Sequence, residues 1–563
     1  MQGSFSLAAL GVLLLLSGNA TADILQAIPA SAHYVVYAKQ LDSLDAKAAQ
    51  VAALVGQPNA PGALQTVKML TGLQQGVHDK GSLAVAILPD ENNLSLPIFF
   101  VPTNDYAALI KQLQPEDSQA EIVEVQIGPQ KMLAARKGDY AVIGNTYSKP
   151  LIESVLTAKK TLGDQLAPLQ KFLDQGDVCV AATPAGVQQG MRQALQGLAM
   201  VKQQMQGLGE QAKMAQAGLD MYESLFKATQ KNVTHFALTA RVEKDGSVHL
   251  DSRTLARPAA GFAKVAQTIK PLPFHPFQRL PGGSYVAAVG GTAEGDWTEQ
   301  MMQWSTQVWQ SMSNGQLKPE DIKKIAEVGN RLTRETKGVS FVMGVGEEEA
   351  PLYSKMSMLI HTENSPAYMK SYESGIREMI ALSKSGSFPL YKNASVEKML
   401  VDGADTLKFS MSPADVPGVD AEQLKEMYQK MFGGEQMATY LAAVDKKTVV
   451  GAYTSPESLS DAMMAAKSAK KDDLASDPML AATMKHLPKD SHWVMVLSPQ
   501  GIAHFTSRSA PAFGIVTDLL AKFPACPPLG MAAKITAEGV DTHMVAPAEM
   551  LKTIGKFAAN AGG

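Results

Sequence analysis

Cysteine is scarce in this chain: Cys179 and Cys526 are the only two in 563 residues. Two cysteines cannot build a disulfide framework, and no C-x-x-C pair is present, so a small disulfide-rich fold is excluded. Cys179 lies in the apolar run 178–182, which predicts a buried and unreactive thiol. The sequence leaves open whether the two cysteines pair.

Strong charge of either sign is also missing. The net charge is −3 and both signs are mixed along the chain, so the basic footprint of a nucleic-acid-binding protein is absent. Beyond residue 16 no apolar stretch reaches the ~20 residues that a membrane helix needs. Hydrophobic residues make up 45% and charged residues 19%, a composition typical of a soluble globular protein.

Local signatures of catalysis and of metal binding are missing as well. The chain has no G-x-S-x-G, no H-E-x-x-H and no calcium loop. Three S-x-x-K patterns at Ser224, Ser395 and Ser468 lack their companion motifs, and the ten His do not cluster with carboxylates. The 29 Met often occupy periodic apolar positions, which favours core filling over copper binding. No catalytic, metal or cofactor residue is therefore predicted.

A glycine-rich turn, Gly290–Gly295, lies between an expected strand and an expected helix. A phosphate-binding loop would continue with Lys and then Ser or Thr, whereas Asp296 and Trp297 follow here. Glu294 would in addition repel an anion. The turn is interpreted as a helix cap.

The N-terminus carries a targeting signal. Residues 5–16 form a short apolar run, and Ala20-Thr21-Ala22 supplies a cleavage site, so residues 1–22 are predicted to be a signal peptide and Asp23 the mature start. Residues 1–22 contain no Lys or Arg, which leaves open whether the true start lies upstream. We expect an exported protein, periplasmic or extracellular.

Five landmarks recur in the same order in the two halves, which predicts an internal duplication. The paired segments are 28–36 with 280–287, 81–86 with 338–343, 98–103 with 357–362, 132–144 with 440–451, and 178–187 with 494–502. The spacing between copies grows toward the C-terminus, which places an insertion at about 413–436 of the second copy. Unrelated strand–helix units with similar propensities are the alternative.

The expected fold is α+β: two tandem homologous domains, each a mixed or mainly antiparallel sheet covered by helices. The first copy is assigned to residues 23–270 and the second to 278–563, with a proline-rich linker at 271–277. Asp245-Gly246 predicts a hairpin between strands 233–241 and 247–255. Helix caps are predicted where a hydroxyl precedes proline, at Thr183, Ser365, Ser455 and Ser498.

A long helical segment, 185–228, distinguishes the first copy. Its apolar residues alternate at spacings of four and three, as in a coiled-coil seam or a helical hairpin. The pattern includes Leu198, Val201, Met205, Leu219 and Tyr222. A projecting arm or an oligomer contact is one interpretation, and helices packed over their own sheet are the other.

Three of the four Trp lie at helical spacing in the second copy, at Trp297, Trp304 and Trp309. An aromatic face of this kind can bind a partner, although burial against the sheet is the more ordinary role. Partner binding is therefore assigned to two groups of residues, namely Trp297, Trp304 and Trp309, and Leu198, Met205 and Leu219.

Three segments resemble a family of exported bacterial proteins of unknown function: I-P-A-S-A-H-Y-V-V-Y at 28–37, L-P-I-F-F-V-P-T-N-D-Y at 96–106 and K-G-D-Y-A-V-I-G at 137–144. The similarity is confined mainly to residues 28–186. It implies export and a repeated α+β unit, and it carries over no activity, cofactor or site residue.

These observations predict an exported, non-catalytic protein that binds a protein partner, or itself through helical segments, or that serves structurally in the cell envelope. Nucleic acid and membrane-spanning segments are not expected. Two alternatives stay open: an exported hydrolase whose residues carry no local motif, and a ligand-binding protein that uses a cleft between the copies.

Overall fold

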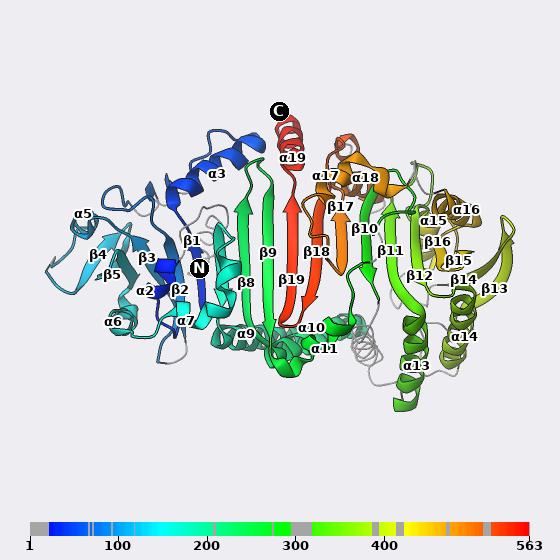
Figure 1. Ribbon diagram of the computed structural model, residues 1–563, viewed down its shortest axis with the longest axis horizontal. Coiled ribbons are helices and arrows are strands. Elements are labelled where there is room, and N and C mark those ends of the chain that lie inside the picture. Colours follow the sequence, from blue (N-terminus) through cyan, green and yellow to red (C-terminus); the bar gives the residue numbers. More distant parts are fainter. Residues whose placement is uncertain are drawn as a thin grey trace. The chain divides into compact units, whose positions relative to one another are not determined.

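The computed structural model describes residues 22–561, apart from 63, 66–67, 70–71, 92–93, 118, 206–209, 273–274, 294–317, 385–392, 413–420, 469–472 and 511–518. Contacts divide the chain into two compact units, and neither is continuous in sequence. Unit 1 is Met1–Ala194, Thr229–Ala260 and Glu538–Gly563, and unit 2 is Leu195–Ala228 and Gly261–Ala537. Figure 1 shows the elements of both.

Unit 1 is built on ten strands in the order β4-β5-β6-β3-β2-β1-β7-β8-β9-β19, and every neighbouring pair is antiparallel. Most of these strands are short and rich in β-branched and aromatic residues. Their bounds are β1 Tyr34–Ala38, β2 Leu83–Pro89, β3 Ser95–Pro102, β4 Ile122–Ile127, β5 Gln130–Lys137, β6 Tyr140–Asn145, β7 Val178–Ala182, β8 Val233–Val242, β9 Val248–Ala256 and β19 Gly539–Ala546.

Both faces of the unit 1 sheet are covered, because successive strand residues point to opposite sides. Val35 and Tyr37 pack in one core with α2, α6, α7 and α8, while Val36 and Ala38 pack in another with α3 and α5. The helices are α2 Ala22–Ala27, α3 Leu41–Leu54, α5 Tyr106–Lys111, α6 Lys149–Thr157, α7 Leu162–Leu166, α8 Gln170–Leu173 and α19 Ala548–Ala561. Helix α19 packs against α3.

The residues just after the expected signal-peptide cleavage site are part of this core. Ile24, Leu25 and Ile28 are almost completely buried. Residues 1–21, which hold most of the predicted signal peptide, lie outside the described residues.

Unit 2 has nine described strands in the order β13-β14-β15-β16-β12-β11-β10-β17-β18, again with antiparallel neighbours. From β14 onward this order matches the order β4-β5-β6-β3-β2-β1-β7-β8 of unit 1. Strand β13 is an additional edge strand. The bounds are β10 Tyr285–Thr292, β11 Thr336–Gly344, β12 Met356–Thr362, β13 Ala394–Val401, β14 Ala404–Met411, β15 Met437–Asp445, β16 Thr448–Tyr453, β17 Trp493–Leu497 and β18 Leu529–Thr536.

Helices cover the unit 2 sheet as well. Ile325 and Val328 of α13 pack with Met379 of α14, and α16 contacts β15 and β16. The helices are α11 Phe262–Thr268, α13 Pro319–Glu335, α14 Ser365–Lys384, α15 Ala421–Phe432, α16 Pro456–Lys467, α17 Pro478–Met484 and α18 Pro499–Ser509. Helix α15 lies in the insertion expected at 413–436, of which residues 413–420 are outside the described part.

The expectation of two tandem domains with separate sheets is wrong, although the α+β class is confirmed. The nineteen strands of the described residues belong to one antiparallel sheet. The last strand, β19, pairs with β9, so the C-terminal segment from Glu538 belongs to unit 1 rather than to the second half of the chain. The physical reason is the edge of β9: β19 pairs the N–H and C=O groups that this edge would otherwise expose.

Several local predictions are confirmed. Asp245-Gly246 closes the β8–β9 hairpin, with Gly246 at φ +90°. The hydroxyls of Thr183, Ser455 and Ser498 accept hydrogen bonds from the first turns of their helices. The cap predicted at Ser365 is wrong: Asn364 caps α14 instead, and the Ser365 hydroxyl donates to the Asp445 carbonyl.

Candidate functional site

The long helical segment of the first copy forms two helices, α9 (Pro184–Met205) and α10 (Glu210–Asn232). The Lys202 ammonium of α9 contacts the carboxylates of Asp220 and Glu223 on α10, so the two helices lie side by side at this level. Near the other end of the pair, the Gln188 amide donates to the Gln230 carbonyl. The helical hairpin, one of the two forms that the spacing predicts, is therefore the form observed.

The predicted partner-binding residues of this segment are only partly exposed. Leu198, Met205 and Leu219 each have intermediate exposure, as expected for side chains between two helices. The remaining predicted binding residues, Trp297, Trp304 and Trp309, lie outside the described residues.

Four large apolar side chains of α9 and α10 are exposed. The heptad pattern places two of them in the seam between the helices and does not include the other two. Met200 is 61% exposed and Val201 43%, and on α10 Tyr222 is 48% and Leu225 43% exposed. Val201 and Tyr222 belong to the predicted seam, whereas Met200 and Leu225 do not. We call these four residues the exposed apolar set. They lie at the level of the Lys202 contacts, and exposed apolar groups of this size can contribute to a binding surface.

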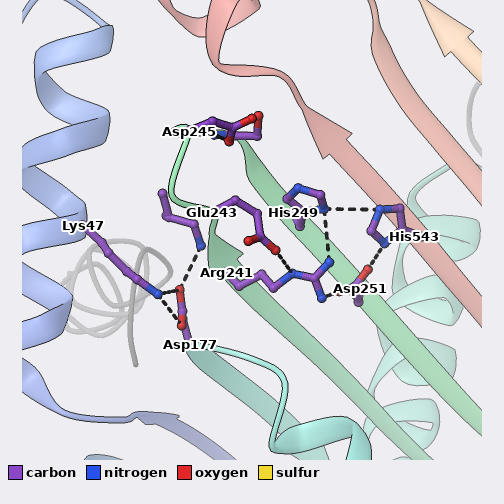
Figure 2. A network of polar contacts seen from close by, with 10 residues as sticks. Lys47, Asp177, Arg241, Glu243, Asp245, His249, Asp251 and His543 are labelled. Carbon is purple, nitrogen blue, oxygen red and sulfur yellow. Dashed lines mark hydrogen bonds and ion pairs between the residues drawn. The ribbon is translucent and has the colours of Figure 1, made fainter. Parts of the chain in front are cut away.

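A second candidate site is a polar network on β8, β9 and β19 of unit 1 (Figure 2). Arg241 of β8 is its centre. Its Nε donates to Glu243 Oε1 at 3.0 Å, its Nη1 to Asp251 Oδ2 at 2.9 Å, and its Nη2 to His249 Nδ1 at 3.3 Å. The guanidinium thus links three partners through three separate nitrogens.

Two histidines meet inside this network. Nδ1 of His543 contacts the carboxylate of Asp251, and its Nε2 lies 3.3 Å from Nδ1 of His249. His249 and Asp251 are buried, with 3% and 7% of their surface exposed. Burial, with the nearby Arg241 and His543, lowers the pKa of His249 to about 4. The His249 ring is therefore neutral at neutral pH and accepts the hydrogen bond from Arg241.

Asp177 lies at the neighbouring end of β7 and joins a helix to the sheet (Figure 2). Its carboxylate accepts from Lys47 of α3 at 2.8 and 2.7 Å and from the Val242 amide of β8 at 2.8 Å. Only 7% of the Asp177 side chain is exposed. A buried carboxylate held by these donors fixes the position of α3 on this sheet.

The contacts between β9 and β19 continue beyond the histidines. Arg253 Nε and Nη2 donate to Asp541 Oδ1 and Oδ2 at 2.8 and 2.6 Å, which is a bidentate pair. The Ser252 and Thr542 hydroxyls meet at 2.7 Å. The Arg253 guanidinium also lies 5.2 Å from the centre of the Phe172 ring.

The Cys179 thiol lies deep in the unit 1 core, as the sequence predicts. It is fully buried, and burial raises its pKa to about 12. The nearby Lys39 is also fully buried, and its ammonium donates to the Leu173 and Asp174 carbonyls at 2.9 Å each. A thiol with so high a pKa stays protonated at neutral pH and is a poor nucleophile.

Two cavities lie in unit 2, on the segment 282–285. One of about 410 Å³ has Ser357, Lys355 and Asp461 in its wall, and the other of about 570 Å³ has Asp477 and Cys526. The Lys355 ammonium is paired with Asp461 at 3.0 Å, and burial raises the pKa of Cys526 to about 11. Neither wall presents a thiolate at neutral pH.

Both cysteines are free in the structure. Across the described residues, no three His, Cys, Asp or Glu side chains are grouped so that they could hold a metal ion. Within the same residues, no helix has the length and apolarity needed to span a bilayer.

No protein-family model matches the sequence, and neither a curated protein nor a solved structure shows significant similarity to it.

Proposed function

We propose that the protein is exported and acts without catalysis, by binding a protein partner in the cell envelope through the exposed apolar set of α9 and α10. The observation that carries this proposal is the exposure of Met200, Val201, Tyr222 and Leu225 on one helix pair. Exposed apolar groups of this size are costly in water unless another surface covers them.

The helix pair is suited to present such a surface because its two helices are tied together. Lys202 has only 18% of its side chain exposed and contacts two carboxylates of α10. An ammonium shared by two carboxylates holds α9 against α10 and limits the conformational freedom that a partner would have to remove. The predicted binding residues Leu198, Met205 and Leu219 then support the surface from within, and the exposed apolar set makes the contact.

A direct test places a photo-crosslinking amino acid at position 200 or 222 of the exported protein in cells. We expect a discrete crosslinked partner at both positions and none at position 94, since Leu94 is equally exposed, at 61%, but lies between β2 and β3 of unit 1. The partner identified by mass spectrometry is then purified, and its affinity is measured by calorimetry.

In that measurement the double variant Met200→Glu, Tyr222→Glu should bind at least about tenfold more weakly, since each charge desolvated in an apolar contact costs more than about 1.4 kcal/mol. Leu94→Glu should bind as the unaltered protein does. Equal weakening by Leu94→Glu, or a crosslinking pattern identical at 94 and 200, would exclude this surface.

Export is part of the same proposal. Residues 5–22 have the pattern of a signal peptide, which supports export. Cell fractionation with intact-mass analysis should find a chain that begins at Asp23 outside the cytoplasm. A cytoplasmic chain that retains residues 1–22 would contradict export.

An internal duplication is also proposed, as a repeat of strand order within one sheet. Five sequence landmarks recur in order, and β1 pairs with β2 and β7 just as β10 pairs with β11 and β17. In both halves a hydroxyl–proline–x–glycine turn, at Thr183 and at Ser498, opens the helix that follows this central set. A duplication of this kind explains why the same strand order occurs twice, and it does not imply that the second set of strands has a separate activity.

A further inference from the structure

The larger of the two cavities on the segment 282–285, about 570 Å³ in volume, has an acidic wall. Asp473 and Asp477 supply its carboxylates, and its described lining contains no Lys, Arg or His. The Cys526 thiol adds no charge, because burial raises its pKa to about 11 and keeps it protonated at neutral pH. Among the described residues, the negative charge of this wall is therefore not balanced from within the cavity.

Both carboxylates are fixed in place by the helix starts that they cap. Asp473 Oδ1 accepts from the Ser476 amide at 3.1 Å, and Asp477 Oδ1 accepts from the Met479 amide at 2.8 Å. Capping of this kind holds a side chain in one position. The second oxygen of Asp477 forms no hydrogen bond with a described residue, so it is available to a bound molecule.

The guanidinium of Arg279 does not neutralise this wall. Only the backbone amide of Arg279 donates to Asp473, at 3.1 Å, whereas its guanidinium donates to Asp445 at 2.7 Å and to Thr448 at 2.9 Å. His275 lies near Asp473, but burial lowers the pKa of its ring, so the ring is neutral at neutral pH. A cation that balances the two carboxylates has to come from outside the described residues.

Tyr285 gives independent evidence for a ligand. Only 4% of its surface is exposed, yet no described residue forms a hydrogen bond with its hydroxyl. Buried hydroxyls are normally hydrogen-bonded. Tyr285 lines the cavity, and burial, with Asp477 and Cys526 nearby, raises the pKa of its hydroxyl, so the group is a phenol and not a phenolate at neutral pH. A molecule bound in the cavity would complete its hydrogen bonds.

We propose that this cavity binds a small aliphatic diamine, with its ammonium groups held by Asp473, Asp477 and the Tyr285 oxygen. Two ammonium groups balance two carboxylates. Each ammonium has three N–H donors, and both a carboxylate and a phenol oxygen accept such bonds. The volume of the cavity lies within the range of about 300 to 1,000 Å³ that is usual for small-molecule sites.

A metal ion is a poorer occupant, since no three His, Cys, Asp or Glu side chains of the described part of the chain are grouped to hold one. The neighbouring cavity does not share the preference for a dication, because Lys355 pairs with Asp461 there at 3.0 Å. The diamine site is separate from the exposed apolar set of α9 and α10, and it does not depend on the function proposed for that surface.

The test is calorimetric titration of the full-length protein with 1,4-diaminobutane. We expect saturable binding of one molecule per chain, and no binding of 1,4-butanediol, which has the same length but no charge. Asp477→Asn removes one charge and keeps a side chain that can cap α17, while Tyr285→Phe removes only the hydroxyl. Each should bind 1,4-diaminobutane at least about tenfold more weakly, because each loses a hydrogen bond to a charged group.

Asp461→Asn, in the wall of the neighbouring cavity, is the matched control and should bind as the unaltered protein does. Denaturant midpoints without the diamine show whether each variant is folded. If Asp477→Asn does not fold, Tyr285→Phe decides, because it removes no hydrogen bond between described residues. The proposal is overturned if 1,4-diaminobutane does not bind at millimolar concentration or if 1,4-butanediol binds equally well. It is also overturned if the folded site variants bind as tightly as the unaltered protein, or if Asp461→Asn weakens binding as much as they do.

Discussion

His249 is the residue whose protonation should matter most for unit 1. Its Nδ1 accepts from Arg241 and lies against His543, so a proton on that nitrogen would face one cation and a second imidazole. The pKa is accordingly lowered from 6.5 to about 4. Because the folded protein binds this proton less readily than the unfolded chain does, the stability that this group contributes is complete above pH 6.5 and falls as the pH decreases toward 4.

The corresponding prediction concerns His249→Gln, which keeps an acceptor for Arg241 but does not titrate. Between pH 6.5 and 4 the free energy of unfolding of the variant should fall less than that of the unaltered protein, by at most about 3 kcal/mol. Urea denaturation at fixed pH values measures the difference. His504→Gln, outside the network, serves as the control, and parallel pH curves for His249→Gln and the unaltered protein would refute the assignment.

Among the secondary-structure elements, α9 and α18 begin in the same way. Each starts after a capping hydroxyl, and a glycine three residues later lies against the strand that opens its half. A Cβ at Gly186 would be 2.0 Å from the His33 carbonyl oxygen, and one at Gly501 would be 1.7 Å from the Tyr285 carbonyl oxygen. Neither helix start could approach its strand this closely with a larger residue.

Gly186→Ala and Gly501→Ala should therefore each lower the free energy of unfolding, by about 1 to 3 kcal/mol, as overpacking against backbone does. Gly197→Ala is the matched control, because a Cβ there meets nothing within 4 Å on the same helix α9. It should be neutral or stabilise the helix by up to about 1 kcal/mol. The test is the denaturant concentration at the midpoint of unfolding, measured for the three variants. Equal midpoints would show that the helix starts can shift to accommodate the added methyl group.

For the whole molecule, the segment from Glu538 onward should be essential, because it completes unit 1. Removal of the residues after Ala537 would expose the β9 edge and uncover the core around Val545 and Met550, of which Val545 is completely buried. An open apolar edge pairs with other chains. The truncated protein should aggregate or lose hydrogen-exchange protection in β8 and β9.

Size-exclusion chromatography and hydrogen exchange monitored by mass spectrometry test this expectation. A chain that ends at Ala561 is the control and should behave like the full-length protein. A truncated chain that stays monomeric with unchanged protection in β9 would show that the segment is dispensable.

The sequence predicted the local structure well because local structure depends on neighbouring residues. The β8–β9 hairpin follows from Asp245-Gly246, and three of the four predicted caps hold because a hydroxyl before proline satisfies the first turn of a helix. The fourth predicted cap is wrong by one residue. Asn364 caps this helix instead, and the Ser365 hydroxyl donates to the Asp445 carbonyl. The burial of Cys179 likewise followed from its apolar run.

The candidate sites were less accessible to sequence reasoning. The heptad spacing located the helix pair, but it counted Val201 and Tyr222 among the seam residues although both are exposed. Periodicity gives the angular position of a side chain and not the axis about which two helices pack. The polar network was missed because Asp177, Arg241, Asp251 and His543 come from four separate strands or strand ends, and no spacing along the chain connects them.

Composition and local pattern alone determined that this chain would fold as α+β, that its strands would be short and its helices capped, and that Cys179 would be buried. Only the tertiary structure decided that β19 returns to β9, so that the described strands form one sheet rather than two tandem domains. The reason is that the sequence of an apolar strand does not specify which other strand it pairs with. The choice is made by the open hydrogen bonds of an edge and by the polar side chains that face it, here Asp251 with His543 and Arg253 with Asp541.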